Sequence, residues 1–316
     1  MTAAATPLPT RQVGRTKLRV PILGLGTAPL HRSEDAVAIA TIHRALEEGV
    51  NFFDSAPLYG NGRSERLLGA ALKGVPRDSY VLSTKVGRLI PEGGGPPPFA
   101  YSRDAVLRSF ESSLERLGID RIDILLVHDP DDHPQEALAT AFPTLAELRS
   151  QGVIGAIGSG MNQWQMLAHF ARNFDIDCFL LAGRYTLLEQ TALDDFLPLC
   201  AEKQISVFPG GVYNSGILAL GPDHPAATYN YAPPPPEIAD RARQIAAVCA
   251  RHGVPLQVAA ANFPLGHPAI TALLIGGESP EQFSGTVAAL RTPIPAALWA
   301  DLKSEGLLRE DAPTPA

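Results

Sequence analysis

The stretch Val50–Leu72, VNFFDSAPLYGNGRSERLLGAAL, contains one complete unit of a strand and a helix. Its first five residues form a short apolar run that ends on Asp54, which is typical of a buried strand. Turn-forming Pro57 and Gly60 follow, and from Arg63 onward the apolar residues recur at helical spacing. A buried strand followed by an amphipathic helix predicts one βα unit of a parallel sheet.

The same unit recurs along the chain of 316 residues. We expect strands at residues 22–25, 50–54, 80–85, 122–128, 153–158, 178–181, 205–208 and 272–275. We expect helices at residues 34–48, 63–73, 102–117, 134–151, 162–172, 189–203, 236–252 and 279–290. This order and length favour an α/β fold of the (β/α)8 TIM-barrel type over a doubly wound sheet. The closest match to a phosphate loop, GLGTAPL at residues 24–30, lacks the third glycine and the strand-to-helix context.

The rest of the chain fits one barrel domain spanning residues 1–316, with its core at about 20–290. A small hairpin at residues 10–19 is expected to close the barrel floor. Proline-flanked stretches at residues 255–264 and 295–307 predict helices added outside the barrel, toward the C-terminus.

Composition argues against several classes of protein. The formal charge is −7 and only 19% of residues are charged, which is not the basic footprint of a nucleic-acid-binding protein. No apolar run is long enough to span a bilayer, and the first residues lack the pattern of a secretion signal, so we expect a cytoplasmic, membrane-free protein. The three cysteines, Cys178, Cys200 and Cys249, lack metal spacing and are expected to be small buried residues.

Three consecutive strands end in ionisable residues. Asp54 ends VNFFD, Lys85 ends YVLSTK, and His128 ends ILLVH. Because side chains alternate along a strand, these residues share a face with Phe52, Ser83 and Leu126, respectively, two positions earlier. We therefore expect the three side chains to point inward and to meet at the barrel mouth.

Tyr59 lies in the loop five residues beyond Asp54 and can fold back over that mouth. A phenol titrates near 10, so acid or base chemistry at neutral pH requires its pKa to fall by about three units. The Lys85 ammonium favours the phenolate, and the Asp54 carboxylate would fix the ammonium in place. We therefore expect Lys85 to lower the pKa of Tyr59.

These motifs together resemble the aldo-keto reductase superfamily. The resemblance covers about residues 13–310 and rests on GVNFFDSAPLYGNGRSERLLGAAL, the STK strand, SLERLGIDRIDILLVHDPD and AIGSGMNQW. It implies a catalytic tetrad of Asp54, Tyr59, Lys85 and His128. It also implies a nicotinamide cofactor bound without a Rossmann fold. Within the superfamily, VHDPDD, LLAGRYTLLEQ, GGVYNSGIL and YNYAPPP are similar to bacterial aldose 1-dehydrogenases that act on L-fucose, L-galactose or D-arabinose.

Residues for the cofactor follow from the resemblance with some departures. The usual serine-asparagine pair after strand five is replaced by IGSGMN, where Ser159 and Asn162 would substitute. Phe208 or Tyr213 would supply a ring against the nicotinamide. The cofactor-binding residues that we expect are Gly26, Thr27, Asp54, Ser159, Asn162, Gly210, Gly211, Gly276, Gly277, Glu278 and Gln282.

The stretch after the last strand, IGGESPEQFSGTVAAL, bears on cofactor choice. Superfamily members that use NADP carry a lysine and an arginine there, but residues 275–290 contain no basic side chain. Gly277 and Gln282 fall where the cations would lie, and Glu278 and Glu281 add negative charge. We therefore expect a preference for NAD, with NADP still possible. Alternatively, the two glutamates serve only the helix N-terminus.

The expected substrate is a small sugar, oxidised at C1 to the lactone. Tyr59, His128, Trp164 and Asn214 are the residues expected to bind it. Polar and aromatic loop residues that could surround it are Arg88, Tyr101, Asp129, Trp164, Asn214, Tyr229, Asn230 and Tyr231.

Other functions remain open at this stage. Within the superfamily they are a pyridoxal dehydrogenase, a general aldehyde reductase and a regulatory barrel that binds cofactor without turnover. The run HDPDDH at residues 128–133 also suggests a metal-dependent hydrolase, but its spacing supplies no full ligand set, so no metal is expected. No sequence feature fixes an oligomeric state.

Overall fold

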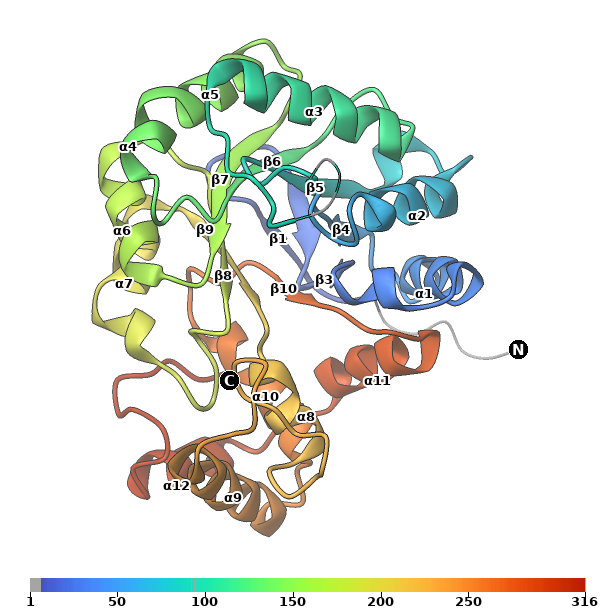
Figure 1. Ribbon diagram of the computed structural model, residues 1–316. Coiled ribbons are helices and arrows are strands. Elements are labelled where there is room, and N and C mark those ends of the chain that lie inside the picture. Colours follow the sequence, from blue (N-terminus) through green and yellow to red (C-terminus); the bar gives the residue numbers. More distant parts are fainter. Residues whose placement is uncertain (1–6, 92, 94, 316) are drawn as a thin grey trace.

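The computed structural model describes residues 7–91, 93 and 95–315, and its centre is a closed barrel of parallel strands (Figure 1). Around the barrel the order is β10, β3, β4, β5, β6, β7, β8 and β9. The bounds are β3 (Leu23–Gly26), β4 (Phe52–Asp54), β5 (Val81–Val86), β6 (Ile124–His128), β7 (Ala156–Met161), β8 (Cys178–Ala182), β9 (Ser206–Gly210) and β10 (Leu273–Ile275). The predicted (β/α)8 barrel is therefore confirmed.

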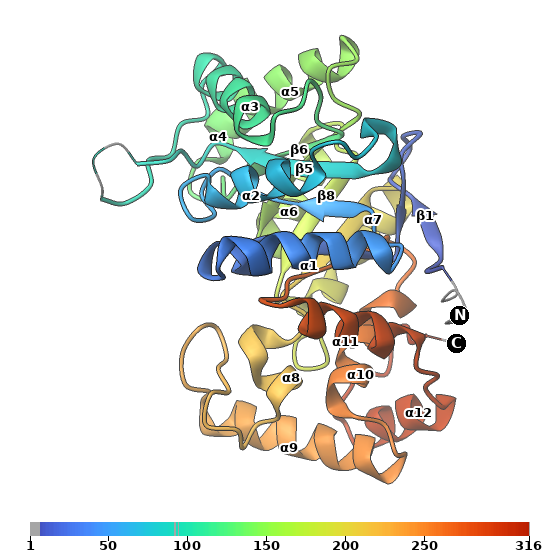
Figure 2. The same ribbon diagram turned by 90° about the vertical axis from the view of Figure 1, so that its right-hand side faces the viewer.

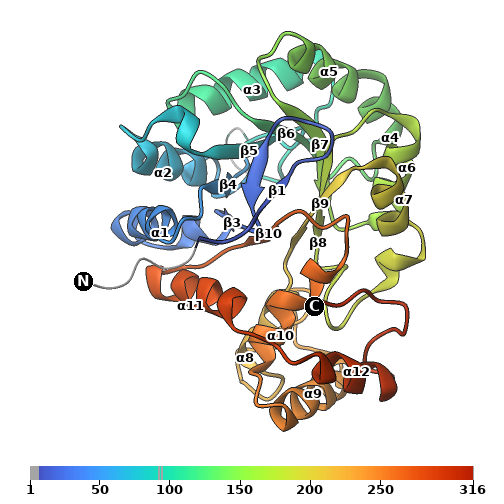
Figure 3. The same cartoon turned by 180° about the vertical axis from the view of Figure 1, so that it is seen from behind.

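Helices surround the strands as a ring (Figures 1 and 3). They are α1 (Asp35–Glu47), α2 (Arg63–Leu72), α3 (Arg103–Leu117), α4 (Pro134–Glu136), α5 (Phe142–Ser150), α6 (Trp164–Asn173), α7 (Phe196–Lys203), α8 (Ile217–Leu220), α9 (Pro236–Arg251), α10 (Leu256–Asn262), α11 (Pro280–Arg291) and α12 (Ala296–Ser304). Short 3-10 turns are η1 (Pro29–Arg32), η2 (Arg77–Ser79), η4 (Thr191–Asp194), η5 (Asn214–Gly216) and η6 (Phe263–Gly266), and η3 (Ala137–Ala141) is a π-helical turn.

In the ring of helices, the place next to α11 is occupied by α10. The sequence analysis predicted that the helix at residues 236–252 would lie there. α10 packs against α11 and α8, while α9 packs against α12 on the outside (Figure 1). The reason is size, because Ala259, Ala260 and Ala261 are fully buried and let α10 approach its neighbours closely. The longer α9 keeps an exposed polar face and covers α10 from outside.

The predicted hairpin is present at the amino-terminal end of the barrel. β1 (Thr10–Gln12) pairs antiparallel with β2 (Arg19–Pro21). Val13 and Val20 are fully buried and belong to the apolar cluster inside the barrel. Figure 3 shows the hairpin lying across this end of the barrel, so the opposite end is left for the active-site loops.

Two local elements differ from the prediction. β7 begins at Ala156 rather than Val153, because the Val153 N–H bonds back to Leu148 O and closes α5 instead of joining the sheet. The helix expected at residues 134–151 contains the wider turn η3 just before Pro143. Proline has no N–H to donate, and such a turn accommodates the missing bond.

Side chains alternate in the barrel as predicted. Phe52 and Phe208 point inward and their rings pack 5.2 Å apart, with Leu126 in the same interior cluster. Two residues after Phe52 and Leu126, Asp54 and His128 continue the inward face at the carboxyl-terminal ends of their strands. This is the end at which barrel enzymes carry out their chemistry.

Candidate active site

Asp54 and Lys85 form a buried ion pair at the barrel mouth. Lys85 Nζ lies 2.6 Å from Asp54 Oδ2 and 2.7 Å from the backbone oxygen of Ser55. Ser83 donates to the other carboxylate oxygen at 2.9 Å. Burial by itself lowers the pKa of Lys85, but the Asp54 carboxylate and Tyr59 outweigh it, and the pKa is raised. The ammonium therefore stays charged and is held in one position.

Tyr59 lies over this ammonium. The loop that carries Tyr59 turns tightly. The Tyr59 N–H donates to Ala56 O, and the Tyr59 carbonyl accepts from the N–H of Ser64 in the first turn of α2. Lys85 Nζ is 4.8 Å from the centre of the Tyr59 ring. The start of α2 thus fixes the phenol beside Lys85.

The expected lowering of the Tyr59 pKa is wrong for this structure. Burial raises the pKa above 10, Lys85 lowers it, and Asp54 raises it again, with a net increase. Desolvation of the phenolate exceeds the attraction of one ammonium because that ammonium is already neutralised by Asp54. Tyr59 is therefore a protonated phenol at neutral pH.

The His128 ring also packs against Tyr59. The two rings meet edge to face, with centres 6.0 Å apart and planes at 90°. Burial, then Lys85 and Arg88, hold the pKa of His128 well below 6.5. Its Nδ1 is buried and has no hydrogen-bond partner within the described residues. A neutral imidazole is thus available to a substrate oxygen.

A second charged pair lies next to His128. Arg88 Nη1 is 2.6 Å from Asp129 Oδ2, and the same oxygen is 3.8 Å from His128 Nε2. The Tyr101 hydroxyl lies 2.7 Å from the carbonyl oxygen of His128 and 2.8 Å from that of Asp129. The structure thus brings together three of the loop residues expected around the substrate.

A cavity of about 370 Å³ opens beside Asp54 and Tyr59. Of the expected cofactor residues, it is lined by Gly26, Asp54, Gly210, Gly211 and Gly276. It is also lined by Arg32, Tyr213 and Tyr231, among others. Phe208 packs inside the barrel instead, so Tyr213 is the ring that faces this space.

Small residues keep this cavity open. A Cβ on Gly276 would lie 2.5 Å from Pro29 Cγ, so the loops after β3 and β10 could not come as close. A Cβ on Gly210 would make ordinary contacts with Leu180 Cδ2 at 3.5 Å and Leu274 O at 3.8 Å, and it would cover the backbone beside the cavity. Glycine at both positions lets a ligand approach the backbone.

Three more expected cofactor residues, Gly277, Glu278 and Gln282, lie in the turn before α11 and in the first turn of that helix. Ser279 caps α11 by accepting from Gln282 N, and Gln282 Oε1 accepts from Glu278 N at 2.9 Å. Glu281 lies in the first turn of the same helix. Hydrogen bonds from its own backbone N–H and from the Ser279 side chain lower the pKa of its carboxyl group. Glu278 Oε1 lies 3.5 Å from Arg32 Nη1.

Arg32 was missed by the sequence analysis. It follows β3, 246 residues before Glu278, and no local pattern relates the two. The turn therefore has a cation beside it, although residues 275–290 contain none.

Ten expected site residues do not line the cavity: Thr27, Lys85, His128, Ser159, Asn162, Trp164, Asn214, Gly277, Glu278 and Gln282. Lys85 and His128 contact Tyr59, which does line it. Thr27 is fully buried and its hydroxyl donates to Ser55. Ser159 faces away from the barrel interior and donates to Val127 O. Asn162 donates to Ala182 O, and the Trp164 indole donates to Thr191.

Asn214 belongs to a cluster centred on Glu189, another residue that sequence analysis missed. The Glu189 carboxylate accepts from Tyr229 at 2.6 Å, from Arg184 at 3.0 Å and from Asn214 at 3.2 Å. The cluster ties the loop after β8 to both ends of the loop after β9. Asn214 lies between Tyr213 and Ser215, which line the cavity, and its buried Oδ1 has no partner among the described residues.

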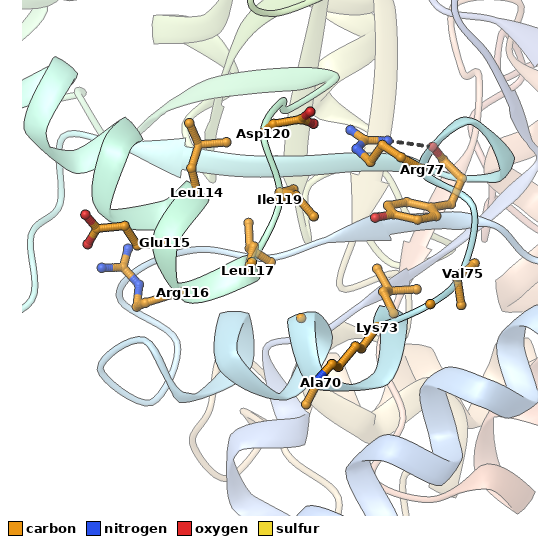
Figure 4. A pocket seen from close by; sticks show the side chains of 15 residues that line it. Ala70, Lys73, Val75, Arg77, Leu114, Glu115, Arg116, Leu117, Ile119 and Asp120 are labelled. Carbon is orange, nitrogen blue, oxygen red and sulfur yellow. Dashed lines mark hydrogen bonds between the residues drawn. The ribbon is translucent and has the colours of Figure 1, made fainter.

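A larger hollow, of about 940 Å³, lies between the ends of α2 and α3 (Figure 4). Its lining includes Leu117, Ile119 and Tyr80, and Tyr80 immediately precedes β5. It is therefore at the opposite end of the strands from Lys85.

Among the described residues, no three His, Cys, Asp or Glu side chains are grouped so as to hold a metal ion. No helix in the described part of the chain has the length and apolar character needed to cross a membrane.

Comparison with known proteins adds four findings. The model of the Aldo/keto reductase family matches residues 22–305. The chain is 41% identical to pyridoxal 4-dehydrogenase of Microbacterium luteolum, over 94% of this chain and 97% of that one. It is 39% identical to D-threo-aldose 1-dehydrogenase of a Pseudomonas species, over 94% and 96%. Among solved structures, the holo form of aldo-keto reductase AKR11C1 from Bacillus halodurans matches with a TM-score of 0.81 and 26% identity, over 96% and 97% of the two chains.

Proposed function

Because this chain belongs to the aldo/keto reductase family, we propose that it is a nicotinamide-dependent dehydrogenase that oxidises an aldose at C1 to the lactone. The observation that carries the proposal is the contact of Lys85 with both Asp54 and the ring of Tyr59, with the His128 ring packed edge to face against the same tyrosine. This group adjoins a cavity lined by glycine backbone. The 39% identity to an aldose dehydrogenase supports the sugar as substrate.

The cavity suits a nicotinamide cofactor. Gly210, Gly211 and Gly276 offer backbone to a pyrophosphate, and Tyr213 offers a ring face. We propose these residues, with Gly26 and Asp54, as the cofactor site. The turn from Gly277 to Gln282 would lie near the adenosine end. When bound, such a cofactor supplies a hydride acceptor.

Tyr59 is the proton-transfer group in this mechanism. In the oxidation of a cyclic hemiacetal, Tyr59 as phenolate takes the proton of the C1 hydroxyl while C1 loses a hydride, and the ring oxygen and C1 become a lactone. Lys85 stabilises the phenolate, and Asp54 holds Lys85 in place. In the reverse direction Tyr59 is the acid, which is the form that its raised pKa favours.

His128 orients the substrate. Because its imidazole is neutral, it can form a hydrogen bond to the C1 oxygen without adding a second positive charge next to Lys85. Tyr59 and His128 thus make contacts with the same oxygen from two sides.

We propose NAD as the preferred cofactor. The Glu278 carboxylate can accept a hydrogen bond from a ribose hydroxyl and repels a phosphate, by the principle known from dinucleotide sites of other folds. Arg32 lies beside this turn, and its ion pair with Glu278 offsets its attraction for a phosphate.

Pyridoxal is the second candidate substrate, favoured by the 41% identity to a pyridoxal dehydrogenase. Like an aldose, pyridoxal closes to a cyclic hemiacetal, through the hydroxymethyl group next to its aldehyde. The same roles for Tyr59 and His128 would give a lactone from it.

A substrate panel tests the proposal. L-Fucose, L-galactose, D-arabinose, pyridoxal and propanal are assayed in both directions with NAD and NADH, and products are identified by mass. We expect lactone formation from at least one aldose, with a higher kcat/KM than for pyridoxal. Turnover of propanal alone, by reduction, would contradict the aldose assignment.

A further inference from the structure

The Arg88–Asp129 pair has the geometry of a binding group for a second substrate oxygen. Asp129 Oδ2 lies 3.8 Å from His128 Nε2, the group that faces the reacting oxygen in the proposed function. Oxygens on adjacent carbons of a sugar ring usually lie closer together than this, and one hydrogen bond from each oxygen can span the two protein groups. A ligand bonded to His128 through one oxygen can therefore reach Asp129 through the next.

The carboxylate is held in position before any substrate arrives. Asp129 has a left-handed backbone, with φ of 46°, and its N–H donates to Gly160 O at 3.0 Å. Tyr101 fixes the carbonyls on both sides of this backbone, as described above. Gly87, with φ of 102°, leaves space for the Tyr101 ring, which a Cβ there would strike. Such pre-organisation is typical of functional sites.

Arg88 holds the carboxylate from the solvent side. Its guanidinium lies 5.2 Å from the centre of the Phe99 ring and forms the short bond to Asp129 Oδ2. The side chains of Arg88 and Asp129 are 25% and 26% exposed, unlike the Asp54–Lys85 pair at 4% and 1%. Asp129 thus has accessible surface, and its remaining lone pairs are available to a hydroxyl donor.

We propose that Asp129, positioned by Arg88, accepts a hydrogen bond from the substrate hydroxyl on the carbon next to the reacting carbon. The pair thereby selects hydroxylated substrates over simple aldehydes. Asp129 is a specificity-determining residue and Arg88 a positioning residue. This inference rests on the proposed function of the same site and adds the substrate feature that the site recognises.

The test compares matched substrates rather than absolute rates. Wild type, Asp129→Asn and Asp129→Gly are assayed for oxidation of an aldose and of its 2-deoxy analogue. They are also assayed for reduction of glycolaldehyde and of acetaldehyde. Asn and Gly both tolerate a left-handed backbone, so neither change strains the loop. Asp132→Asn, on an exposed residue of the same loop, is the control for loss of one charge.

We expect the ratio of kcat/KM for hydroxylated over deoxy substrate to fall about tenfold to a hundredfold in both Asp129 variants, the range of a hydrogen bond to a charged group. Asp132→Asn keeps the wild-type ratio. In Arg88→Lys the preference for the hydroxylated substrate is partly retained, because a cation still faces Asp129. In Arg88→Met this preference is lost.

The outcomes separate the two proposals. Aldose oxidation with an unchanged ratio in both Asp129 variants overturns the role of Asp129 and leaves the proposed function intact. No lactone from any aldose, together with a glycolaldehyde ratio that falls in the variants, refutes the proposed function and supports Asp129. A wild type that uses hydroxylated and deoxy substrates equally well also overturns the inference.

Discussion

At the scale of single residues, the proton-transfer group is set by opposing effects of burial and charge. Burial disfavours the Tyr59 phenolate, while Lys85, 4.8 Å from its ring centre, favours it. The net effect raises the pKa of Tyr59. The resting enzyme is therefore prepared to donate a proton, and it must lose one before it can oxidise a hemiacetal.

Removing the Tyr59 hydroxyl tests this role. Tyr59→Phe should lower kcat about 10²- to 10⁴-fold, the contribution of a positioned acid or base. Binding of NAD, followed by fluorescence, should change little because the ring remains. Tyr80→Phe makes the same change at the opposite end of the barrel and serves as the control. Retained turnover in Tyr59→Phe would exclude Tyr59 as the proton-transfer group.

The pH dependence follows from the same pKa. Since kcat/KM reports the free enzyme, the value for oxidation should rise with pH beyond neutrality, because more Tyr59 is ionised. The value for reduction should stay flat over that range, because Tyr59 remains protonated below 10. His128 is neutral throughout and adds no titration there. An oxidation profile that reaches a plateau near pH 7 would show that Tyr59 titrates lower than its burial implies.

At the scale of elements, a buried carboxylate joins α2, α3 and β5 behind Lys85. Glu65 on α2 is fully buried and accepts from Arg116 on α3 and from Thr84 on β5, both at 2.6 Å. Thr84 directly precedes Lys85 and points to the opposite face of the strand. The contact thus links the packing of two helices to the strand that carries the ammonium.

Breaking this buried pair should be costly. Glu65→Ala leaves the largely buried Arg116 without its carboxylate and Thr84 without its acceptor, and it should lower the free energy of unfolding by about 3 kcal/mol, measured by urea denaturation. Glu147→Ala is the control, because its pair with Arg103 is largely exposed, and it should cost no more than about 1 kcal/mol. Equal losses in the two variants would contradict the structural role of Glu65.

The contact between η1 and the turn before α11 is expected to decide cofactor choice. Glu278→Ser removes the carboxylate and frees Arg32 to bond to the 2′-phosphate of NADP. The ratio of kcat/KM for NADP over NAD should therefore rise roughly tenfold, the contribution of one hydrogen bond to a charged group. Adding Arg32→Met should reverse the gain. If Glu278→Ser leaves the ratio unchanged, the ribose is recognised elsewhere.

At the scale of the whole molecule, two buried neutral histidines lie in different parts of the fold. His128 stands at the barrel mouth, and His267 packs against Tyr185 near the C-terminal helices, with ring centres 5.9 Å apart. Burial lowers the pKa of His267 to about 4 and that of His128 well below 6.5. Both gain a proton on unfolding whenever the pH is below about 6.5.

This difference predicts acid sensitivity. Because the unfolded chain binds more protons between pH 6.5 and 4, stability falls as the pH drops through that range, by up to about 1.4 kcal/mol per pH unit for each histidine. His267→Asn, whose amide oxygen can replace the acceptor for Ala269 N, should reduce the slope. Urea denaturation at several pH values measures it. A wild type with constant stability from pH 7 to 5 would contradict the prediction.

The sequence by itself determined the features that depend on neighbours along the chain. Alternation along a strand placed Asp54, Lys85 and His128 on the inward face. Repetition of the βα unit determined the barrel. These patterns are readable because the period of a strand or a helix is a local property of the backbone.

Only the tertiary structure decided the features that depend on distant segments. These are the ring position of α10, the meeting of Arg32 with Glu278 and the direction of the Tyr59 pKa shift. Close packing of small residues selects the helix, and burial by several loops sets the desolvation of the phenol. Both arise from contacts between segments far apart in the sequence, so no local pattern contains them.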